Sequence, residues 1–565
     1  MGESRPQSRT GDSQAIESKP SSPNGHVSSA TEDASTQLET SYVEGLPLLL
    51  VMGAVSVASF LVLLDTSIIA TAIPQITSDF HSLKDISWYG SAYQLSSAVI
   101  QPLVGKLYTQ FSLKWVYLAF FVIFEVGSLV CGVAPSSDVL IIGRAIAGIG
   151  VAGIFAGGLT IIASAIRPEK RSVNMGLMMG VAQLGLVSGP LIGGALTQRA
   201  SWRWCKCFYI NLPIGAIVLG GILFIKIADQ QPVPPVAQAV RELPKRLDLI
   251  GFAMFAGAST MLMLALQWGG TTYAWSSAVT IGLFCGSAAS LTAYVAWSWN
   301  RGDESLIPPV LLKQRVVIAC FSLTLFMIGS ALMLSYWLPV YFQAVRGQNP
   351  IGSGVSMLPN ILASVVFSIV GGIMIGKVGY YVPQAVIGTA LLTVATGLCS
   401  TLDPYTSTGK WVGYQFLAGV GRGLMQQVPY TAIPHSCSQQ MIPIAMSFMV
   451  LGQYIGGSVF LALSNVVFSS SLESLLRVYA PKIDAATVTA AGASAADMRK
   501  LIPADQLTGV IKAYSLSIDR VFYLGTGSAA VMFVAAFFTG WIDTRVQKDK
   551  HESVPDEASS SKEDS

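Results

Sequence analysis

The chain has 565 residues, of which 52% are hydrophobic and only 12% are charged. Charged residues make up about a quarter of a typical soluble domain, so this composition excludes an ordinary soluble protein and indicates one that lies in a membrane. The formal net charge of +3 is spread over the connecting segments rather than gathered in one basic region, so it gives no indication of a nucleic-acid partner.

The chain begins with residues 1–44, which are rich in Ser, Thr, Pro and acidic residues and show no apolar periodicity. This composition predicts a disordered tail. From Leu46 onward, apolar stretches of roughly 20 residues follow one another, each long enough to cross about 30 Å of hydrocarbon. We therefore predict an all-α polytopic membrane protein with fourteen membrane spans. The predicted spans are 47–70, 88–108, 114–134, 138–163, 173–196, 208–228, 248–268, 277–299, 317–342, 352–376, 382–402, 411–431, 443–468 and 521–541.

Lysine and arginine are distributed unevenly over the short loops that join these spans. Thirteen lie in or beside one set of alternate loops, and six lie in or beside the other set. Because basic residues are retained on the cytosolic side, the first set of loops is predicted to be cytosolic. The even number of spans then places both tails, 1–44 and 546–565, in the cytosol.

The segment 470–520 interrupts the regular spacing of the spans and is predicted to be a long outer loop. Within it, Leu472–Tyr479 and Ala495–Leu516 have helical patterns but are too polar to span a membrane. We expect two separate helices that lie at the membrane surface or cap the outer mouth of the protein.

An internal repeat relates the two ends of the spanning region. An offset of 271 residues maps Gly105-Lys106 onto Gly376-Lys377 and Gly185 onto Gly456. One offset that holds over about 80 residues indicates two related halves, as in parallel-repeat transporters. The predicted parts are a six-helix half at 45–230, a cytosolic linker at 231–247, an inserted helix pair at 248–300 and a second six-helix half at 301–545.

Three of the charged residues inside predicted spans are candidates for proton coupling. Asp65 lies in span 1, Glu125 in span 3 and Arg144 in span 4. Charged side chains at such depth usually face a cavity or an opposite charge, and a buried carboxylate can exchange protons. We assign proton coupling to these three residues. For Asp65 and Arg144 the alternative is a purely structural ion pair.

Span 5 is unusually rich in glycine. A recurrence every four or five residues predicts that most of these glycines lie along one helix face; they are Gly176, Gly180, Gly185, Gly189 and Gly193. Small residues let a second helix approach closely, and Pro190 removes a backbone donor and predicts a bend. We expect this face to be a tight helix contact, and an ordinary glycine-rich packing helix is the alternative.

Two sequence patterns imitate nucleotide-binding motifs. Residues 148–153 fit GxGxxG but lie in a span without βαβ context, and in 371–378 a valine replaces the hydroxyl residue that a phosphate-binding loop needs. The four histidines are scattered over tails and loops, and Cys205-Lys206-Cys207 has neither zinc nor redox spacing. We therefore predict that the chain is not an enzyme and binds no metal and no cofactor.

Several motifs together resemble one family. The spacing of the glycines and Pro190 in span 5 resembles the antiporter motif of the major facilitator superfamily. Further segments resemble the fungal fourteen-span drug:proton antiporter branch of that family, namely 64–76 (LDTSIIATAIPQI), 105–115 (GKLYTQFSLKW), 140–150, 202–215 and 266–270. The resemblance extends from about residue 46 to residue 545.

The resemblance implies the major facilitator fold, with two pseudo-symmetric halves, and proton-coupled export of a toxin, drug or secondary metabolite. It also implies a gate at the loop after span 2, formed by Gly105, Lys106 and Lys114. The chain departs from the family at Thr109, where an acidic residue is usual, and at Cys205-Lys206-Cys207, where one cysteine is usual.

The implied energy source is the proton gradient rather than a cofactor. The implied partners are a small-molecule substrate, protons and the lipid bilayer, with no nucleic acid. We expect a monomer in the plasma membrane, with a vacuolar or vesicle membrane as the alternative location. A proton-coupled importer on the same fold, such as a siderophore–iron transporter, is the competing function.

The substrate itself is expected to be amphipathic and moderately hydrophobic. The expected cavity residues are Gln94, Gln183, Gln426, Gln427 and Gln453. Amide side chains both donate and accept hydrogen bonds, so such walls tolerate varied ligands. The alternative for each glutamine is a hydrogen bond to a neighbouring helix.

Overall fold

A computed structural model describes residues 42–80, 85–199, 208–224, 247–270, 272–483 and 502–544. Several predicted features lie outside these residues. They are the tails up to residue 41 and from residue 545, most of the linker at 231–247, Cys205-Lys206-Cys207, and residues 484–501 of the predicted outer loop.

The regular secondary structure of the described residues is helical, apart from one isolated bridge between Gly269 and Tyr273. A helix pairs all its backbone polar groups internally, which a membrane requires and which these apolar sequences allow. The main helices are α1 (Gly45–Phe80), α2 (Ile86–Gln110), α3 (Leu113–Val133), α4 (Ser137–Ala165), α5 (Pro168–Arg199), α6 (Asn211–Phe224), α8 (Leu249–Trp268), α9 (Ala278–Arg301), α11 (Arg315–Val340), α12 (Pro350–Ser356), α13 (Leu358–Val378), α14 (Val382–Cys399), α15 (Thr408–Met425), α16 (Val428–Ser436), α17 (Ile442–Tyr479) and α20 (Ala504–Ala536).

A helix overlaps each of the fourteen predicted spans. Ten helical stretches of the described residues are long and apolar enough to cross a membrane, and α6 is apolar but shorter. The all-α polytopic class is therefore confirmed, whereas the count of fourteen spans stays a prediction.

The predicted outer loop differs from the structure at both of its ends. α17 continues without a break to Tyr479, so Leu472–Tyr479 extends the preceding span instead of forming a separate surface helix. α20 begins at Ala504 and continues to Ala536, so the second expected helix is joined to the last span. The prediction of two separate helices was wrong, because polarity ended the predicted spans although the helical backbone continues.

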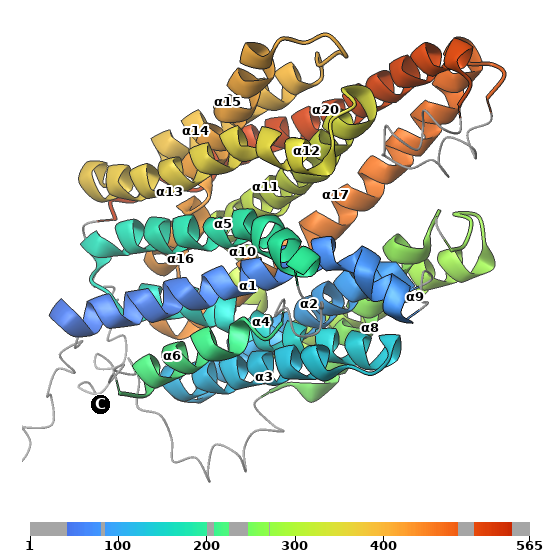
Figure 1. Ribbon diagram of the computed structural model, residues 1–565. Helices are drawn as coiled ribbons and strands as arrows, with labels where there is room; N and C mark the ends of the chain where they lie inside the picture. Colours follow the sequence, from blue (N-terminus) through green and yellow to red (C-terminus); the bar gives the residue numbers. More distant parts are fainter. Residues whose placement is uncertain are drawn as a thin grey trace, which may run out of the picture. The chain divides into compact units, whose positions relative to one another are not determined.

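The helices fall into two groups by their packing (Figure 1). In the N-terminal group, α1 packs on α5 and α6, and α4 packs on α2 and α3. In the C-terminal group, α13 and α14 pack on α15, while α11, α17 and α20 pack on one another. These groups coincide with the halves that the internal repeat indicates.

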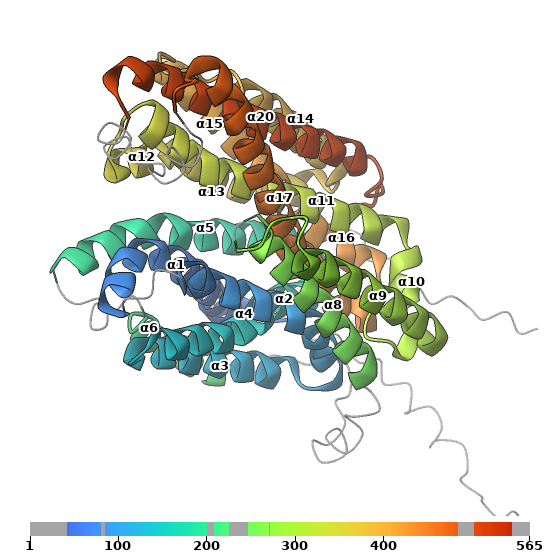
Figure 2. The ribbon, with the colours of Figure 1, turned by 90° about the vertical axis from the view of Figure 1, so that its right-hand side faces the viewer.

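The two most extensive contacts between the groups join α2 to α17 and α5 to α13. We call these two contacts the seam. The repeat offset of 271 residues places α2 on α13 and α5 on α17, so the repeat relates one contact to the other. The inserted helices α8 and α9 lie side by side, and α8 packs on α2 and α17 (Figure 2).

One helix of the C-terminal group loses a backbone hydrogen bond near its middle. α15 ends at Met425 and α16 begins at Val428, and Gln426 and Gln427 between them keep right-handed helical dihedral angles. Pro429 stands in the first turn of α16 and has no N–H to donate to the preceding turn. Gln426 N–H still donates to the carbonyl of Arg422 at 3.0 Å, so the helical backbone continues through this point.

Candidate functional site

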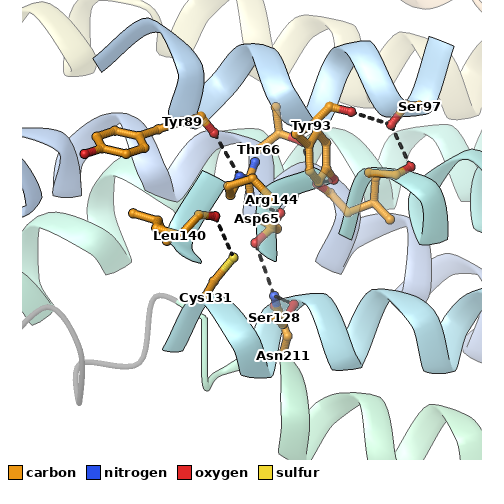
Figure 3. A network of polar contacts seen from close by, with 12 residues as sticks. Asp65, Thr66, Tyr89, Tyr93, Ser97, Ser128, Cys131, Leu140, Arg144 and Asn211 are labelled. Carbon is orange, nitrogen blue, oxygen red and sulfur yellow. Dashed lines mark hydrogen bonds and ion pairs between the residues drawn. The ribbon is translucent and has the colours of Figure 1, made fainter. Parts of the chain in front are cut away.

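Asp65 of α1 and Arg144 of α4 form a fully buried ion pair in the N-terminal group (Figure 3). Arg144 Nη1 lies 2.6 Å from Asp65 Oδ2, and the two side chains are 1% and 0% exposed. Arg144 Nε donates to the backbone carbonyl of Tyr89 at 3.0 Å, and the Tyr93 ring lies 4.2 Å from the guanidinium carbon. The pair therefore ties α1, α2 and α4 together.

Asn211, at the start of α6, completes this network. Its Nδ2 donates to Asp65 Oδ1 at 3.4 Å and to Ser128 Oγ of α3 at 3.2 Å. Sequence reasoning did not select Asn211, although it stands in the segment 208–215 that resembles the family. The sequence did offer a signal for Asn211, because a polar carboxamide at the first turn of an apolar helix is unusual.

Glu125 lies elsewhere, in the contact between α3 and α6. Both of its carboxyl oxygens are buried and have no hydrogen-bond partner in the part of the chain that the structure describes. Gly215 of α6 makes room for it, because a Cβ at that position would lie 2.0 Å from Glu125 Oε1. The ion-pair partner of Arg144 is thus Asp65, and the structure does not bring Glu125 into that pair.

The four glycines of α5 whose surroundings are described, Gly176, Gly180, Gly185 and Gly189, form two faces rather than one. A Cβ on Gly176 would lie 2.5 Å from the carbonyl oxygen of Ser368 in α13, across the seam. A Cβ on Gly185 would lie 2.3 Å from the carbonyl oxygen of Phe60 in α1. The five-residue step from Gly180 to Gly185 rotates the helix by about 140°, which moves the second pair to another side.

Of the remaining residues of the antiporter motif, Gly189 lies on the second face, against α1. A Cβ on Gly189 would lie 2.4 Å from Ser67 Oγ of α1. α5 remains helical through Pro190 and Gly193, but their side-chain surroundings lie outside the described part of the structure. The two faces place α5 between α1 of its own group and α13 of the other.

The three predicted gate residues do not share one contact. A Cβ on Gly105 would lie 2.8 Å from Ile444 Cα, so α2 and α17 approach closely there. Lys106 Nζ donates to the backbone carbonyls of Asp303 and Glu304, both at 3.3 Å. Lys114 Nζ instead donates to the carbonyl of Leu223 in α6, within the N-terminal group.

The predicted cavity glutamines lie in several places. Gln183 of α5 accepts from Arg422 Nη2 at 3.4 Å, and Gln426 Nε2 lies 3.5 Å from Met179 Sδ. The buried amide of Gln427 has no hydrogen-bond partner. The other two predicted glutamines are Gln94, which is half-buried on α2, and Gln453, which donates to the hydroxyl of Tyr430.

Two further residues that bond from one group to the other were missed by sequence reasoning. Gln101 Nε2 of α2 donates to Ser447 Oγ of α17 at 3.0 Å. Arg422 of α15 is 8% exposed and bonds to residues of both groups. Its signal was present in the sequence, because an arginine inside the apolar span 411–431 is itself unusual. Among the described residues, no group of three His, Cys, Asp or Glu side chains is arranged to bind a metal.

Comparisons with known proteins agree with this architecture. Residues 55–461 match the Major Facilitator Superfamily. The chain is 47% identical to the MFS-type transporter pigP of Monascus ruber over 90% of this chain and 88% of that protein. It is also 47% identical to the efflux pump mlcE of Penicillium citrinum over 92% of this chain and 95% of that protein.

The fold also matches solved structures. The human organic anion transporter MFSD10 superposes with a TM-score of 0.58 over 87% of this chain and all of that chain. At 14% identity this similarity concerns the fold alone.

Proposed function

Because this chain belongs to the major facilitator superfamily, we propose that it exports a small amphipathic molecule in exchange for protons. It is a multi-pass membrane transporter rather than an enzyme. Two similar fungal proteins carry the name efflux pump, which supports export of a fungal toxin, drug or secondary metabolite. The proton gradient supplies the energy, and no cofactor takes part.

The observation that carries the coupling proposal is the buried pair of Asp65 and Arg144. Outside water, an ion pair is stable only while both members remain charged and close together. Adding a proton to Asp65 removes one charge, frees the Arg144 guanidinium and weakens the bond between α1 and α4. A proton at this position therefore changes how the helices of the N-terminal group pack, which is what coupling requires.

Glu125 is the second acid in the coupling proposal. A carboxylate that is buried without a donor or a cation beside it favours its neutral form. Its two unpaired oxygens, held against Gly215 between α3 and α6, give it room for a proton without a rearranged ion pair. Glu125 takes and releases a proton at the α3–α6 contact, while Asp65 acts through Arg144.

The seam supports an alternating cycle. Its close approaches at Gly105, Gly176 and Gly372 lie toward the end of the helices that carries Lys106, Arg171 and Lys377. That end is the one predicted to be cytosolic. We assign this conformation to the state that is closed toward the cytosol, so the seam must open on that side to load substrate.

Expression in a sensitive host tests the direction and the energy source together. A strain that expresses the chain should accumulate less of an exported toxin than the parent strain, and a protonophore should remove that difference. Higher accumulation in the expressing strain would instead establish an importer, such as a siderophore–iron transporter. Asp65→Asn should reach the membrane but fail to respond to the proton gradient.

The identity of the compound requires a separate measurement. Deletion of the gene should raise the intracellular level of one metabolite and lower resistance to that metabolite. A fluorescent fusion should show the protein at the plasma membrane, and a signal confined to vacuoles or vesicles would assign export into those compartments. A monomer should elute from size-exclusion chromatography in detergent.

A further inference from the structure

Arg422 is a buried cation without an acidic partner among the described residues. Its Nη2 donates to Ser364 Oγ at 2.9 Å and to Gln183 Oε1 at 3.4 Å, both of which are neutral groups. Its Nε is buried and has no hydrogen-bond partner. Among the described residues, the ion pairs are those of Arg144, Arg167, Arg301, Arg477 and Lys482, so no carboxylate of that part of the chain neutralises Arg422.

Arg422 lies between the two groups of helices. It reaches from α15 past Ser364 of α13 to Gln183 of α5, so one guanidinium contacts both sides of the seam. Gln183 stands at the middle of the 32-residue helix α5. A ligand bound to Arg422 would therefore lie at mid-depth and would contact both groups.

A second polar contact lies one helical turn away. Gln426 follows Arg422 by four residues, so the two side chains share one face of the helix near the end of α15. Gln426 Nε2 lies 3.5 Å from Met179 Sδ, and its buried Oε1 accepts no hydrogen bond from the described residues. An unused acceptor thus lies on the same side of the helix as the unpaired charge.

A charge buried in this way is costly unless an opposite charge reaches it. Arg422 lies in the last turn of α15, where the helix dipole offsets part of the charge but does not replace a counterion. We propose that the missing counterion is the transported substrate, and that the substrate is a small organic anion whose carboxylate binds Arg422. This assignment rests on the proposed function and specifies the substrate class of the same pathway.

The chemistry of the surroundings favours one carboxylate over a more highly charged group. A guanidinium presents parallel N–H groups that match the two oxygens of a carboxylate, and the Nε–H of Arg422 is available for such a bond. The hydrogen-bond partners of Arg422 are the neutral side chains of Ser364 and Gln183, so one positive charge is balanced by one negative charge. The rest of the ligand would contact amides and the thioether of Met179.

Binding of a matched pair of probes tests this assignment without any transport measurement. The probes are 11-(dansylamino)undecanoic acid and its methyl ester, which share a fluorophore and chain and differ in the charge of the carboxyl group. The full chain is purified and placed in lipid nanodiscs, and Kd is measured from dansyl fluorescence. The acid should bind the native chain at least about tenfold more tightly than the ester.

Variants at Arg422 locate the preference. Arg422→Gln should reduce the ratio of the two Kd values to about one by weakening the acid alone, and Arg422→Lys should keep part of the preference. Ser364→Asp supplies an internal carboxylate and should also remove the preference. Arg477→Gln is the matched control, because Arg477 is 77% exposed and its loss should leave the ratio unchanged.

Three outcomes would overturn the assignment. They are equal binding of acid and ester to the native chain, no measurable binding of the acid, and an equal weakening of both probes by Arg422→Gln, which would mark a structural residue. The assay needs neither a proton gradient nor export, so its result is separate from that of the proposed function. A chain that binds the acid selectively but exports nothing would contradict export and leave the anion site standing.

Discussion

Two buried arginines of this transporter differ in whether an acidic residue neutralises their charge. Arg144 lies inside the N-terminal group, 2.6 Å from Asp65, and the pair is almost completely excluded from solvent. Arg422 lies at the seam between groups and contacts only neutral side chains among the described residues. A charge that is neutralised within one group stabilises that group, whereas a charge left unneutralised between two groups is available to a ligand.

The glycines of α5 also differ in whether they contact a helix of their own group or a helix of the other group. Gly185 lies against α1 within the N-terminal group, and Gly176 lies against α13 across the seam. Added bulk at the first position opposes folding of one group. Added bulk at the second position opposes the contact between two groups that are already folded. The transport cycle opens and closes that contact.

The largest expected effect is the loss of one member of the neutralised pair. Arg144→Ala leaves Asp65 buried without its cation and should lower the free energy of unfolding by about 3–5 kcal/mol. Thermal unfolding of the purified protein in detergent measures this loss. The double variant Asp65→Asn with Arg144→Gln should recover much of the stability while transport stays absent. If Arg144→Ala unfolds like the native protein, the view that Arg144 neutralises a buried Asp65 is wrong.

A smaller effect is expected from bulk on the two glycine faces. Gly185→Val should lower the free energy of unfolding by about 1–3 kcal/mol, because a side chain cannot enter the contact with α1 without shifting it. Gly176→Val should change thermal unfolding less and slow export more, because it opposes closure of the seam. The comparison requires both variants in one assay of unfolding and export. If the two rank the other way round, the assignment of the faces fails.

An acidic residue placed beside Arg422 should form an ion pair there, like the pair of Arg144 and Asp65 in the N-terminal group. Ser364→Asp puts a carboxylate where an oxygen already lies 2.9 Å from Arg422 Nη2. The new ion pair should raise the free energy of unfolding by about 1 kcal/mol and block export. Thermal unfolding and export of one substrate measure the two effects. Lower stability together with normal export would show that Arg422 already has a counterion.

The smallest effect on stability is expected when the unpaired charge is removed. Arg422→Met keeps the length of the side chain and deletes a buried cation, so the free energy of unfolding should change by less than about 1 kcal/mol or should rise. Thermal unfolding beside Arg144→Ala provides the comparison. A loss as large as that of Arg144→Ala would mean that Arg422 stabilises the fold in its own right.

The sequence alone determined the membrane class and the approximate positions of the main helices, and it predicted two related halves. Apolar stretches of spanning length leave few alternatives to helices, because every backbone polar group must be paired in a bilayer. The repeat offset survives in residues such as Gly185 and Gly456, which both lie at close helix contacts where a larger side chain would not fit. Asp65 and Arg144 were selected because an intramembrane charge is costly wherever its partner lies.

Only the tertiary structure decided which neighbour each of these residues meets. Nothing in the local pattern shows that Asp65 is the partner of Arg144 while Glu125 remains apart. Nor does it show that Gly176 and Gly185 face different helices, or that Arg422 has no acid beside it. These facts depend on the order and rotation of helices that are distant in the chain, and a periodicity of 3.6 residues specifies a face but not the helix against which it packs.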